Sequence, residues 1–305
     1  MGCRRIPYPD QPPNPNPLTW RNVIFKQWFG KKETPADAPP SILAEGLHQP
    51  PSLYVISESA NGKLRDKNED AIFTYSAHDA ASKGVAALGL YIVADGMGGH
   101  KNGELASKTA IEAVKTDLLA NLVEPLLAGN TITDDAFVES AINQAFLQAQ
   151  EAVLSKAQGS GTTLTLLFIA DTMAYYGHVG DSRLYADTRS EGLRCLTVDH
   201  SLVRRLVDLG QVESSAAREH PQRNILFRAL GQGEGFKVDL GKLKLNEATV
   251  FLLCSDGLWG LVDQNSLARY LRPGRQNGET ASRLVALANE AGGTDNISAI
   301  VIAVS

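Results

Sequence analysis

Hydrophobic residues along this chain fall into short runs and into longer periodic segments, and the two patterns predict different elements. Short runs rich in Val, Ile, Leu, Tyr and Phe, bounded by Gly, Asp or Asn, are typical of strands buried in a sheet. Segments in which apolar residues return every three or four positions are typical of helices with one buried face. The short runs predict strands at Leu53–Glu58, Ala71–Ser76, Leu88–Asp95, Thr163–Ala170, Ala174–Tyr185, Leu193–Val198, Thr249–Cys254 and Ile297–Val304.

Two long helical segments lie between the third and fourth of these strands. The first extends from about Gly103 to Leu127, and the second begins after Thr133, which we interpret as its N-cap because acidic residues follow it in the first turn. Since strands are grouped with strands rather than alternating with helices, the pattern predicts an α+β fold with antiparallel sheets covered by helices. Shorter helices are predicted at Leu202–Leu209, Ser266–Leu271 and Thr280–Ala291.

Proline divides the chain into an N-terminal tail, residues 1–51, and one domain, residues 52–305. Eleven of the 14 prolines lie in the tail, a composition that favours extended polyproline geometry and linker behaviour. The exception within it is an apolar stripe of Trp20, Ile24 and Trp28, which would share one face of a short helix. The stripe fits packing onto the chain's own domain, docking onto a partner protein, or contact with a membrane surface.

Composition and charge exclude several classes of function. A net charge of −5 and a pI near 5.7 argue against nucleic acid as a partner, because phosphate backbones select basic surfaces. No apolar run approaches the roughly 20 residues of a transmembrane helix, and the N-terminus lacks the apolar stretch of a signal peptide. The three scattered cysteines form neither a disulfide framework nor a zinc site. We therefore expect a cytoplasmic globular protein with no transmembrane segment.

Acidic residues lie where the predicted strands begin or end. Asp95 and Asp256 each follow an apolar run and precede a glycine. Because a strand fixes the backbone, a carboxylate at its end can be directed at a shared point, and the glycine permits close approach. Several hard oxygen ligands without a matching Cys or His cluster suit Mg²⁺ or Mn²⁺ rather than zinc. The residues placed in this way are Glu69, Asp70, Asp95, Asp181, Asp256 and Asp295.

Each of these motifs alone is also typical of an ordinary turn, and the glycine-rich stretch 96–99 lacks the Lys-Ser/Thr pair of a nucleotide-binding loop. The complete ordered set, however, resembles the metal-dependent protein phosphatases of the 2C type over about residues 52–305. The matching motifs are Arg65-Asp66-Lys67-Asn68-Glu69-Asp70, Val93-Ala94-Asp95-Gly96-Met97-Gly98-Gly99, Gly161-Thr162-Thr163, Val179-Gly180-Asp181-Ser182-Arg183, Leu253-Cys254-Ser255-Asp256-Gly257-Leu258-Trp259 and Asp295-Asn296-Ile297-Ser298.

This resemblance implies an α/β/β/α sandwich, in which helices flank two central antiparallel sheets. It also implies a centre of two Mn²⁺ or Mg²⁺ ions bridged by Asp95. The Gly96 carbonyl and Glu69 would bind the first ion, whereas Asp256 and Asp295 would bind the second. The implied reaction is attack of a metal-activated water on phosphorus, with no side-chain nucleophile.

Three further residues receive roles from the same resemblance. Asp70 would hold metal-bound waters, Asp181 would contribute to a third and weaker metal site, and Arg65 would pair with the substrate phosphate through its two-pronged guanidinium. The chain differs from animal members at Met97, where they carry a histidine thought to protonate the leaving alcohol. In this respect it resembles bacterial members of the family.

The resemblance implies a protein serine/threonine phosphatase that acts on phosphorylated proteins and opposes a serine/threonine kinase. A catalytically silent phosphoprotein-binding regulator of the same fold is the alternative, although none of the metal-binding aspartates is missing. A hydrolase for another substrate, such as a partner-switching protein or a small phosphate ester, is a third interpretation.

Residues 199–228 resemble the variable flap beside the family's active site. The arginines there would either recruit phosphorylated or acidic peptides or form a solvated face. These arginines are Arg204, Arg205, Arg218, Arg223 and Arg228.

Overall fold

The computed structural model describes most of residues 51–305 and only residues 29–31 of the segment before them. The described residues are 29–31, 51–77, 87–98, 102–213, 216–233, 236–245 and 248–305. The apolar stripe of Trp20, Ile24 and Trp28 therefore lies outside the described residues. None of the helices in the described part of the chain is both long enough and apolar enough to cross a bilayer.

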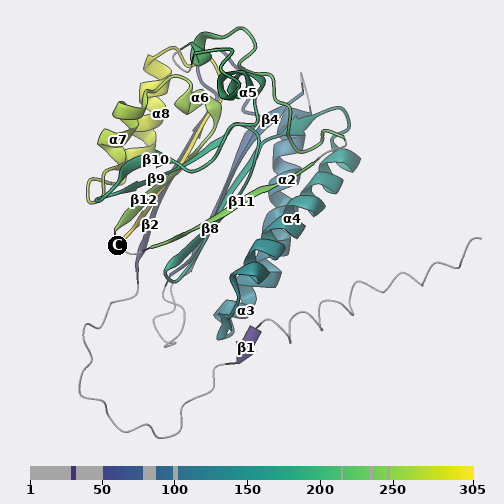
Figure 1. The fold of residues 1–305 in the computed structure, drawn as a ribbon, viewed down its shortest axis with the longest axis vertical. Coiled ribbons are helices and arrows are strands. Elements are labelled where there is room, and N and C mark those ends of the chain that lie inside the picture. The colour runs from purple at the N-terminus through teal and green to yellow at the C-terminus, as the bar shows by residue number, and fades with distance from the viewer. Residues whose placement is uncertain are drawn as a thin grey trace, which may run out of the picture.

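Two antiparallel sheets form the centre of the molecule (Figure 1). One has the strand order β10-β9-β12-β13-β2, and the other has the order β11-β8-β7-β4-β3 with the short β6 beside β4. A separate two-stranded sheet pairs β1 (Phe29–Lys31) with β5 (Asn130–Ile132). The strands of the two large sheets are β2 (Leu53–Ala60), β3 (Asp70–Ala77), β4 (Leu88–Met97), β6 (Gly161–Thr162), β7 (Leu164–Ala170), β8 (Met173–Val179), β9 (Arg183–Thr188), β10 (Gly192–Cys195), β11 (Asp239–Lys244), β12 (Thr249–Cys254) and β13 (Ile297–Val304).

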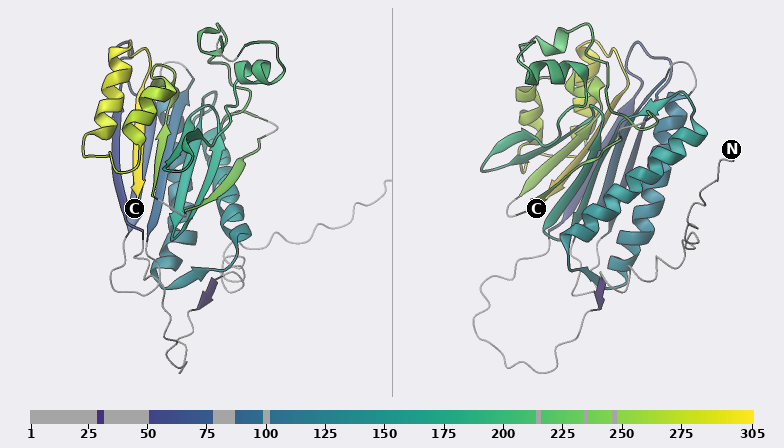
Figure 2. Two further views of the ribbon diagram at one scale, coloured as in Figure 1. Left: turned by 60° about the vertical axis from the view of Figure 1, so that its left-hand side comes forward. Right: turned by 45° about the vertical axis from the view of Figure 1, so that its right-hand side comes forward.

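Helices cover the outer face of each sheet (Figure 2). The long helices α2 (Gly103–Leu118) and α4 (Asp135–Lys156) pack on the sheet that contains β4, and α7 (Gln264–Leu271) and α8 (Thr280–Glu290) pack on the sheet that contains β12. The predicted α/β/β/α sandwich is therefore confirmed. The remaining helices of the described residues are α3 (Glu124–Leu127), which follows α2 through a π-helical turn at Leu119–Val123, α5 (Leu202–Asp208), a 3₁₀ turn at Ala217–Glu219, and α6 (Asp256–Trp259).

Strand β12 shows why the predicted strands are continuous apolar runs rather than alternating ones. Successive side chains of a strand point to opposite faces of the sheet. Val250 and Leu252 accordingly pack against the helices, while Phe251 and Leu253 pack between the two sheets. All six residues of β12 are buried, so apolar side chains are favoured on both faces of the strand.

The predicted strand Ala174–Tyr185 is wrong, because the chain forms two strands there, β8 and β9. Between them lies the turn of Gly180, Asp181 and Ser182, in which Gly180 has a φ of +112°. A side chain at Gly180 would be strained by this φ and would also meet Thr163. The turn directs Asp181 away from the sheet, which places its carboxylate at the end of the sandwich.

Two smaller differences have local causes. The N-cap of α4 is Asp134 rather than Thr133, since the Asp134 side chain accepts a hydrogen bond from the Ala136 N–H at 2.8 Å. Strand β11 had not been expected, because its lysines and glycine obscure the apolar pattern. It lies at the edge of its sheet, where charged side chains are common.

We expect Gly177→Ala to destabilise the packing of α4 on its sheet. A Cβ at Gly177 would meet the side chains of Ile142 and Phe146 at 2.8 Å, and such overpacking costs about 1–3 kcal/mol of unfolding free energy. Urea unfolding would measure this loss. Gly233→Ala is the matched control, because its Cβ would meet open space, and equal stability of the two variants would contradict the prediction.

Candidate active site

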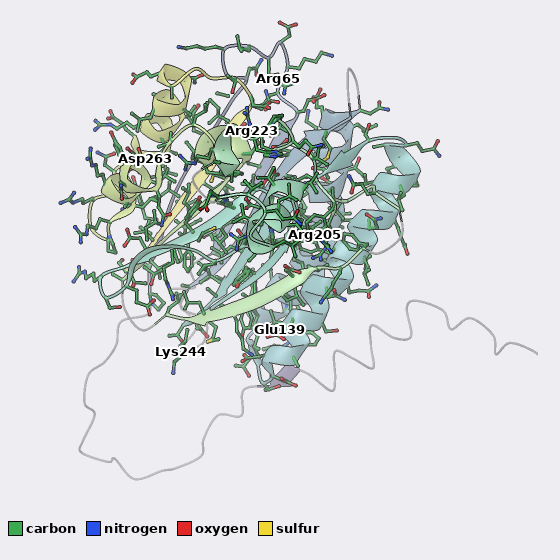
Figure 3. All side chains as sticks on the ribbon, turned by 45° about the horizontal axis from the view of Figure 1, so that its top comes forward. Arg65, Glu139, Arg205, Arg223, Lys244 and Asp263 are labelled. Atoms are coloured by element: carbon green, nitrogen blue, oxygen red, sulfur yellow. The ribbon has the colours of Figure 1, made fainter. Side chains whose placement is uncertain are left out.

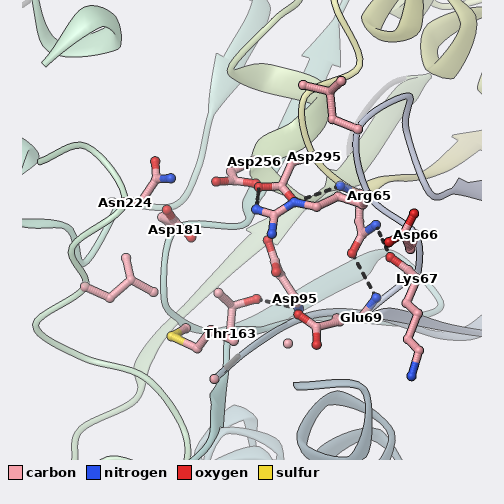
Figure 4. A pocket seen from close by; sticks show the side chains of 16 residues that line it. Arg65, Asp66, Lys67, Glu69, Asp95, Thr163, Asp181, Asn224, Asp256 and Asp295 are labelled. Atoms are coloured by element: carbon pink, nitrogen blue, oxygen red, sulfur yellow. Dashed lines mark hydrogen bonds and ion pairs between the residues drawn. The ribbon is translucent and has the colours of Figure 1, made fainter. Parts of the chain in front are cut away.

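A cleft of about 570 Å³ opens at the end of the sandwich where β4 and β12 finish. Its lining comes from segments that are far apart in the sequence, as Figure 4 shows. Glu69 precedes β3, Asp181 lies in the β8–β9 turn, and Asp295 precedes β13. The predicted site residues among the lining are Arg65, Glu69, Asp95, Gly96, Asp181, Asp256 and Asp295.

Strand register explains why these residues meet. Asp70 lies directly opposite Asp95 in the β3–β4 pair. Cys254, at the end of β12, pairs with Arg183 of β9 on one side and Ala299 of β13 on the other. The segments that leave β12 and enter β9 and β13 therefore reach the same end of the sheets. These segments carry Asp256, Asp181 and Asp295.

Asp70 lies behind the cleft, and its side chain is held on one oxygen only. Its Oδ2 accepts hydrogen bonds from Ser255 and Ser298, each at 2.7 Å. Its Oδ1 is buried and has no hydrogen-bond partner among the described residues. Burial raises the pKa of Asp70 to about 7. A buried acceptor without a partner is costly, so Oδ1 is suited to accept a hydrogen bond from a water or from a ligand's shell.

The carboxylates of the cleft destabilise one another in their charged forms. Burial, followed by the charges of Asp70 and Asp256, raises the pKa of Asp95 well above its ordinary value. The pKa of Asp181 is also raised well above its ordinary value, again mainly by burial and then by Asp256. Burial and the charge of Asp295 raise the pKa of Asp256 to about 6. A cleft of this kind favours protons or cations.

The donor chemistry fits Mn²⁺ or Mg²⁺. The cleft offers carboxylate oxygens and a backbone carbonyl, which are the ligands that hard divalent ions prefer. The free oxygen of Asp70 and the raised carboxylate pKa values fit the same interpretation. In the described part of the chain, no three Asp, Glu, His or Cys side chains are close enough to hold one ion as they stand. The fit therefore concerns donor type, burial and charge rather than a closed coordination sphere.

Gly96 lies at a point where β4, α2 and the segment of Glu69 come together. Its N–H donates to the Glu69 carbonyl at 3.2 Å. A Cβ at Gly96 would overlap the Gly103 carbonyl oxygen and would meet the Glu69 carbonyl oxygen at 2.7 Å. Only glycine permits this packing, which keeps Glu69 beside the end of β4.

Asn296 holds the segment that carries Arg65 and Glu69 in place through three hydrogen bonds. The sequence did not reveal this role. Asn296 Oδ1 accepts the Glu69 N–H at 2.8 Å, and its Nδ2 donates to the carbonyls of Asn61 (3.0 Å) and Lys67 (2.8 Å). In the sequence, Asn296 was a member of the motif Asp295-Asn296-Ile297-Ser298 but had no role of its own. Ser255 and Ser298, which hold Asp70, were missed in the same way.

Arg65 enters the cleft from the same segment. Its Nη2 donates to Asp295 Oδ2 at 2.8 Å, and half of its side chain is exposed. This bond, together with the charge of Asp295, raises the pKa of Arg65, so the guanidinium is a fixed cation at the mouth of the cleft. Met97 also lines the cleft, and the described lining contains no histidine.

The predicted flap forms one wall of the cleft through Asn224 and Leu226. Arg223 lowers the pKa of Asp256 against the opposing effect of burial, and Figure 3 places it at the same end of the molecule as Arg65. Arg204 instead pairs with Asp208 at 3.0 Å on the surface of α5, which agrees with a solvated helix face. Recruitment of acidic peptides by the flap stays a prediction.

Comparison with known proteins identifies the family of this chain. The profile of the protein phosphatase 2C family matches residues 66–290. The serine/threonine phosphatase stp of Listeria monocytogenes is 33% identical over 241 residues, which are 79% of this chain and 92% of that protein. The chain therefore belongs to the protein phosphatase 2C family, as its motifs indicated.

Solved structures of the family superpose on this fold. The serine/threonine phosphatase PstP/Ppp of Mycobacterium tuberculosis has a TM-score of 0.68 and 31% identity over 82% of this chain and 97% of that chain. A catalytic domain of PstP, determined in complex with two manganese ions, has a TM-score of 0.66 and 30% identity over 83% of this chain and 99% of that chain.

Proposed function

We propose that this protein is a metal-dependent protein serine/threonine phosphatase, which hydrolyses phosphoserine and phosphothreonine in other proteins. The observation that carries this proposal is the cleft itself, where buried carboxylates with raised pKa values surround one another and Arg65 lies at the mouth. Relatives that are named serine/threonine phosphatases support the substrate class.

Asp95, Asp256 and Asp295, together with Glu69 and the Gly96 carbonyl, would hold two Mn²⁺ or Mg²⁺ ions. Support comes from their common position in the cleft and from the two manganese ions of the related PstP domain. When bound, such ions lower the pKa of a shared water and neutralise charge on the phosphoryl oxygens. Asp181, which lines the same cleft, would contribute to a third site.

The chain's own groups bind and orient the substrate. The half-exposed Arg65 would bind two oxygens of the phosphate, because a guanidinium matches their spacing. Asp70 would orient the attacking water through its free Oδ1. Since the described lining offers no histidine, the leaving alcohol would take its proton from water in the cleft.

The silent regulator is the weaker alternative, because every predicted metal-binding residue is present in the cleft or behind it. Opposition to a serine/threonine kinase, a cytoplasmic location, and the division into a tail (1–51) and a phosphatase domain (52–305) stay predictions. So does docking of the tail onto the domain or onto a partner.

Phosphate release from matched phosphothreonine, phosphoserine and phosphotyrosine peptides would test the function. We expect release from the first two with Mn²⁺ and background rates with EDTA, because the carboxylates need a divalent cation to act. Preference for the phosphotyrosine peptide would contradict the substrate class. No release at any Mn²⁺ or Mg²⁺ concentration, from a protein that still binds phosphopeptides, would favour the silent regulator.

A further inference from the structure

The turn that carries Asp181 is held by residues from three separate parts of the fold. The Asp181 carbonyl accepts a hydrogen bond from Trp259 Nε1 of α6 at 2.9 Å. Ser182 Oγ bonds to Thr163 Oγ1 at 2.7 Å, and the Thr163 hydroxyl in turn accepts the Asp95 N–H at 2.9 Å. The third contact is made by His200, a residue to which the sequence assigned no role.

His200 binds both polar groups of the Gly180 backbone. The His200 N–H donates to the Gly180 carbonyl at 2.7 Å, and the Gly180 N–H donates to His200 Nδ1 at 3.0 Å. His200 is only 3% exposed, so water does not compete for these bonds. Since glycine populates positive and negative φ about equally, the two bonds from His200 help to hold Gly180 at its φ of +112°.

The hydrogen bonds also define the form of the imidazole ring. The Gly180 N–H can only donate, so Nδ1 must be unprotonated, and the proton of the neutral ring lies on Nε2. Nε2 then donates to Asp239 Oδ2 at 3.0 Å. Arg228 Nη1 also lies 3.0 Å from Nε2, but with the proton on Nε2 it donates to the other oxygen of Asp239, at 2.8 Å. Burial lowers the pKa of His200, which agrees with a neutral ring.

The same histidine lies near the start of the flap (residues 199–228) and is bonded to the other end of that segment. The His200 carbonyl accepts the Phe227 N–H at 3.0 Å, and the Phe227 ring lies 5.8 Å from the imidazole between centroids. Leu226, the preceding residue, lines the cleft. His200 therefore connects the flap wall of the cleft to the turn that carries Asp181.

We propose that His200 is a positioning residue, which holds the Asp181 carboxylate in the cleft through the Gly180 peptide groups and couples its position to the flap. This inference rests on the proposed function, since it gives Asp181 a part in cation binding. Removing the Nδ1 acceptor would leave the Gly180 N–H buried and without a partner, a state that favours rearrangement of the turn.

A matched pair of variants separates this role from simple filling of space. In His200→Asn, the amide oxygen is as many bonds from Cβ as Nδ1 is, so it can still accept the Gly180 N–H. In His200→Gln, the amide nitrogen instead takes the place of Nε2, which keeps the Asp239 bond and loses the Gly180 bond. Both variants remove the ring and its packing, so we expect similar losses of melting temperature.

The first measurement is hydrogen exchange of the metal-free proteins, in a peptide that covers Gly180. We expect exchange at least about tenfold faster in His200→Gln, with near wild-type protection in His200→Asn, since a lost hydrogen bond exposes the amide. The second is calorimetric titration with Mn²⁺, together with turnover of p-nitrophenyl phosphate. We expect about tenfold weaker binding of the weakest ion and lower kcat in His200→Gln only, the size usual when a group supporting a metal ligand is lost.

Equal exchange and equal Mn²⁺ titrations in the two variants would overturn the positioning role, and His200 would then only fill space. Faster exchange in His200→Gln with unchanged Mn²⁺ binding and kcat would overturn the link from the turn to Asp181. The exchange result does not depend on phosphatase activity. Failure of the proposed function would instead appear as wild-type protein without Mn²⁺-dependent turnover.

Discussion

Asp256→Asn should remove nearly all phosphatase activity and at the same time raise the stability of the metal-free protein. Asn keeps the size of the side chain at the start of α6 but lacks the charge that a divalent cation requires. Losing several kcal/mol of transition-state stabilisation corresponds to a roughly thousandfold lower kcat. The stability gain arises because burial and Asp295 raise the pKa of Asp256 to about 6, so its charge at pH 7.5 costs on the order of 1–3 kcal/mol.

Turnover of p-nitrophenyl phosphate and thermal unfolding in EDTA would be measured on the same preparation. Asp263→Asn is the matched control, since it makes the same chemical change at the N-cap of α7, where Asn caps a helix as well as Asp. Near-normal turnover of Asp256→Asn at ordinary Mn²⁺ concentrations would reject its role as a ligand. A large drop in melting temperature would show that the loss of activity reflects damage to the fold.

The sequence was sufficient to predict the acidic side of the cleft because local rules decide it. An apolar strand followed by Asp-Gly marks the region where the strand ends: Asp95 lies two residues before the end of β4, and Asp256 lies two residues after the end of β12. The two strands that carry these motifs, β4 and β12, are buried on nearly every residue. Their patterns were therefore strong, and the helices between them were recognisable from their apolar periodicity.

The parts that the sequence did not predict depend on contacts between distant segments. Ser298 holds Asp70 from 228 residues away, and Trp259 holds the Asp181 carbonyl from 78 residues away. No local pattern marks a serine or a tryptophan for such a role. The turn at Gly180 was missed because the apolar residues on both sides of it resemble one continuous strand, whereas the positive φ of Gly180 and its close contact with Thr163 separate β8 from β9.

The donor groups that support the cleft are mostly neutral, which matters for how the site works. The Asp70 carboxylate accepts hydrogen bonds from two serine hydroxyls. Glu69 is held through its backbone N–H, which donates to the Asn296 side-chain oxygen, so this contact places no cation on its carboxylate. Neutral donors orient a carboxylate without cancelling its charge. The negative charge of the cleft therefore stays available for a cation, and the cost of that charge is largest when no cation is bound.

This cost predicts how pH changes the effect of Mn²⁺ on stability. In the folded, metal-free protein the pKa of Asp70 is about 7 and that of Asp256 about 6, above the value near 4 of an unfolded chain. Their contribution to stability is therefore fully present below about pH 4 and is lost as the pH rises through 6 to 7. Binding of a cation must displace these protons, so Mn²⁺ binds more weakly at low pH.

We therefore expect Mn²⁺ to raise the melting temperature more at pH 8 than at pH 5.5. At a Mn²⁺ concentration a hundred times its Kd, binding stabilises the folded state by about 2.7 kcal/mol, which is a rise of roughly 5–10 °C for a domain of this size. At pH 5.5 the rise should be less than half as large. Thermal unfolding with Mn²⁺ and with EDTA at both pH values would measure it, and Asp256→Asn should show a smaller rise at each. A rise that is equal at the two pH values, or larger at pH 5.5, would mean that the raised carboxylates are not the groups that bind the cation.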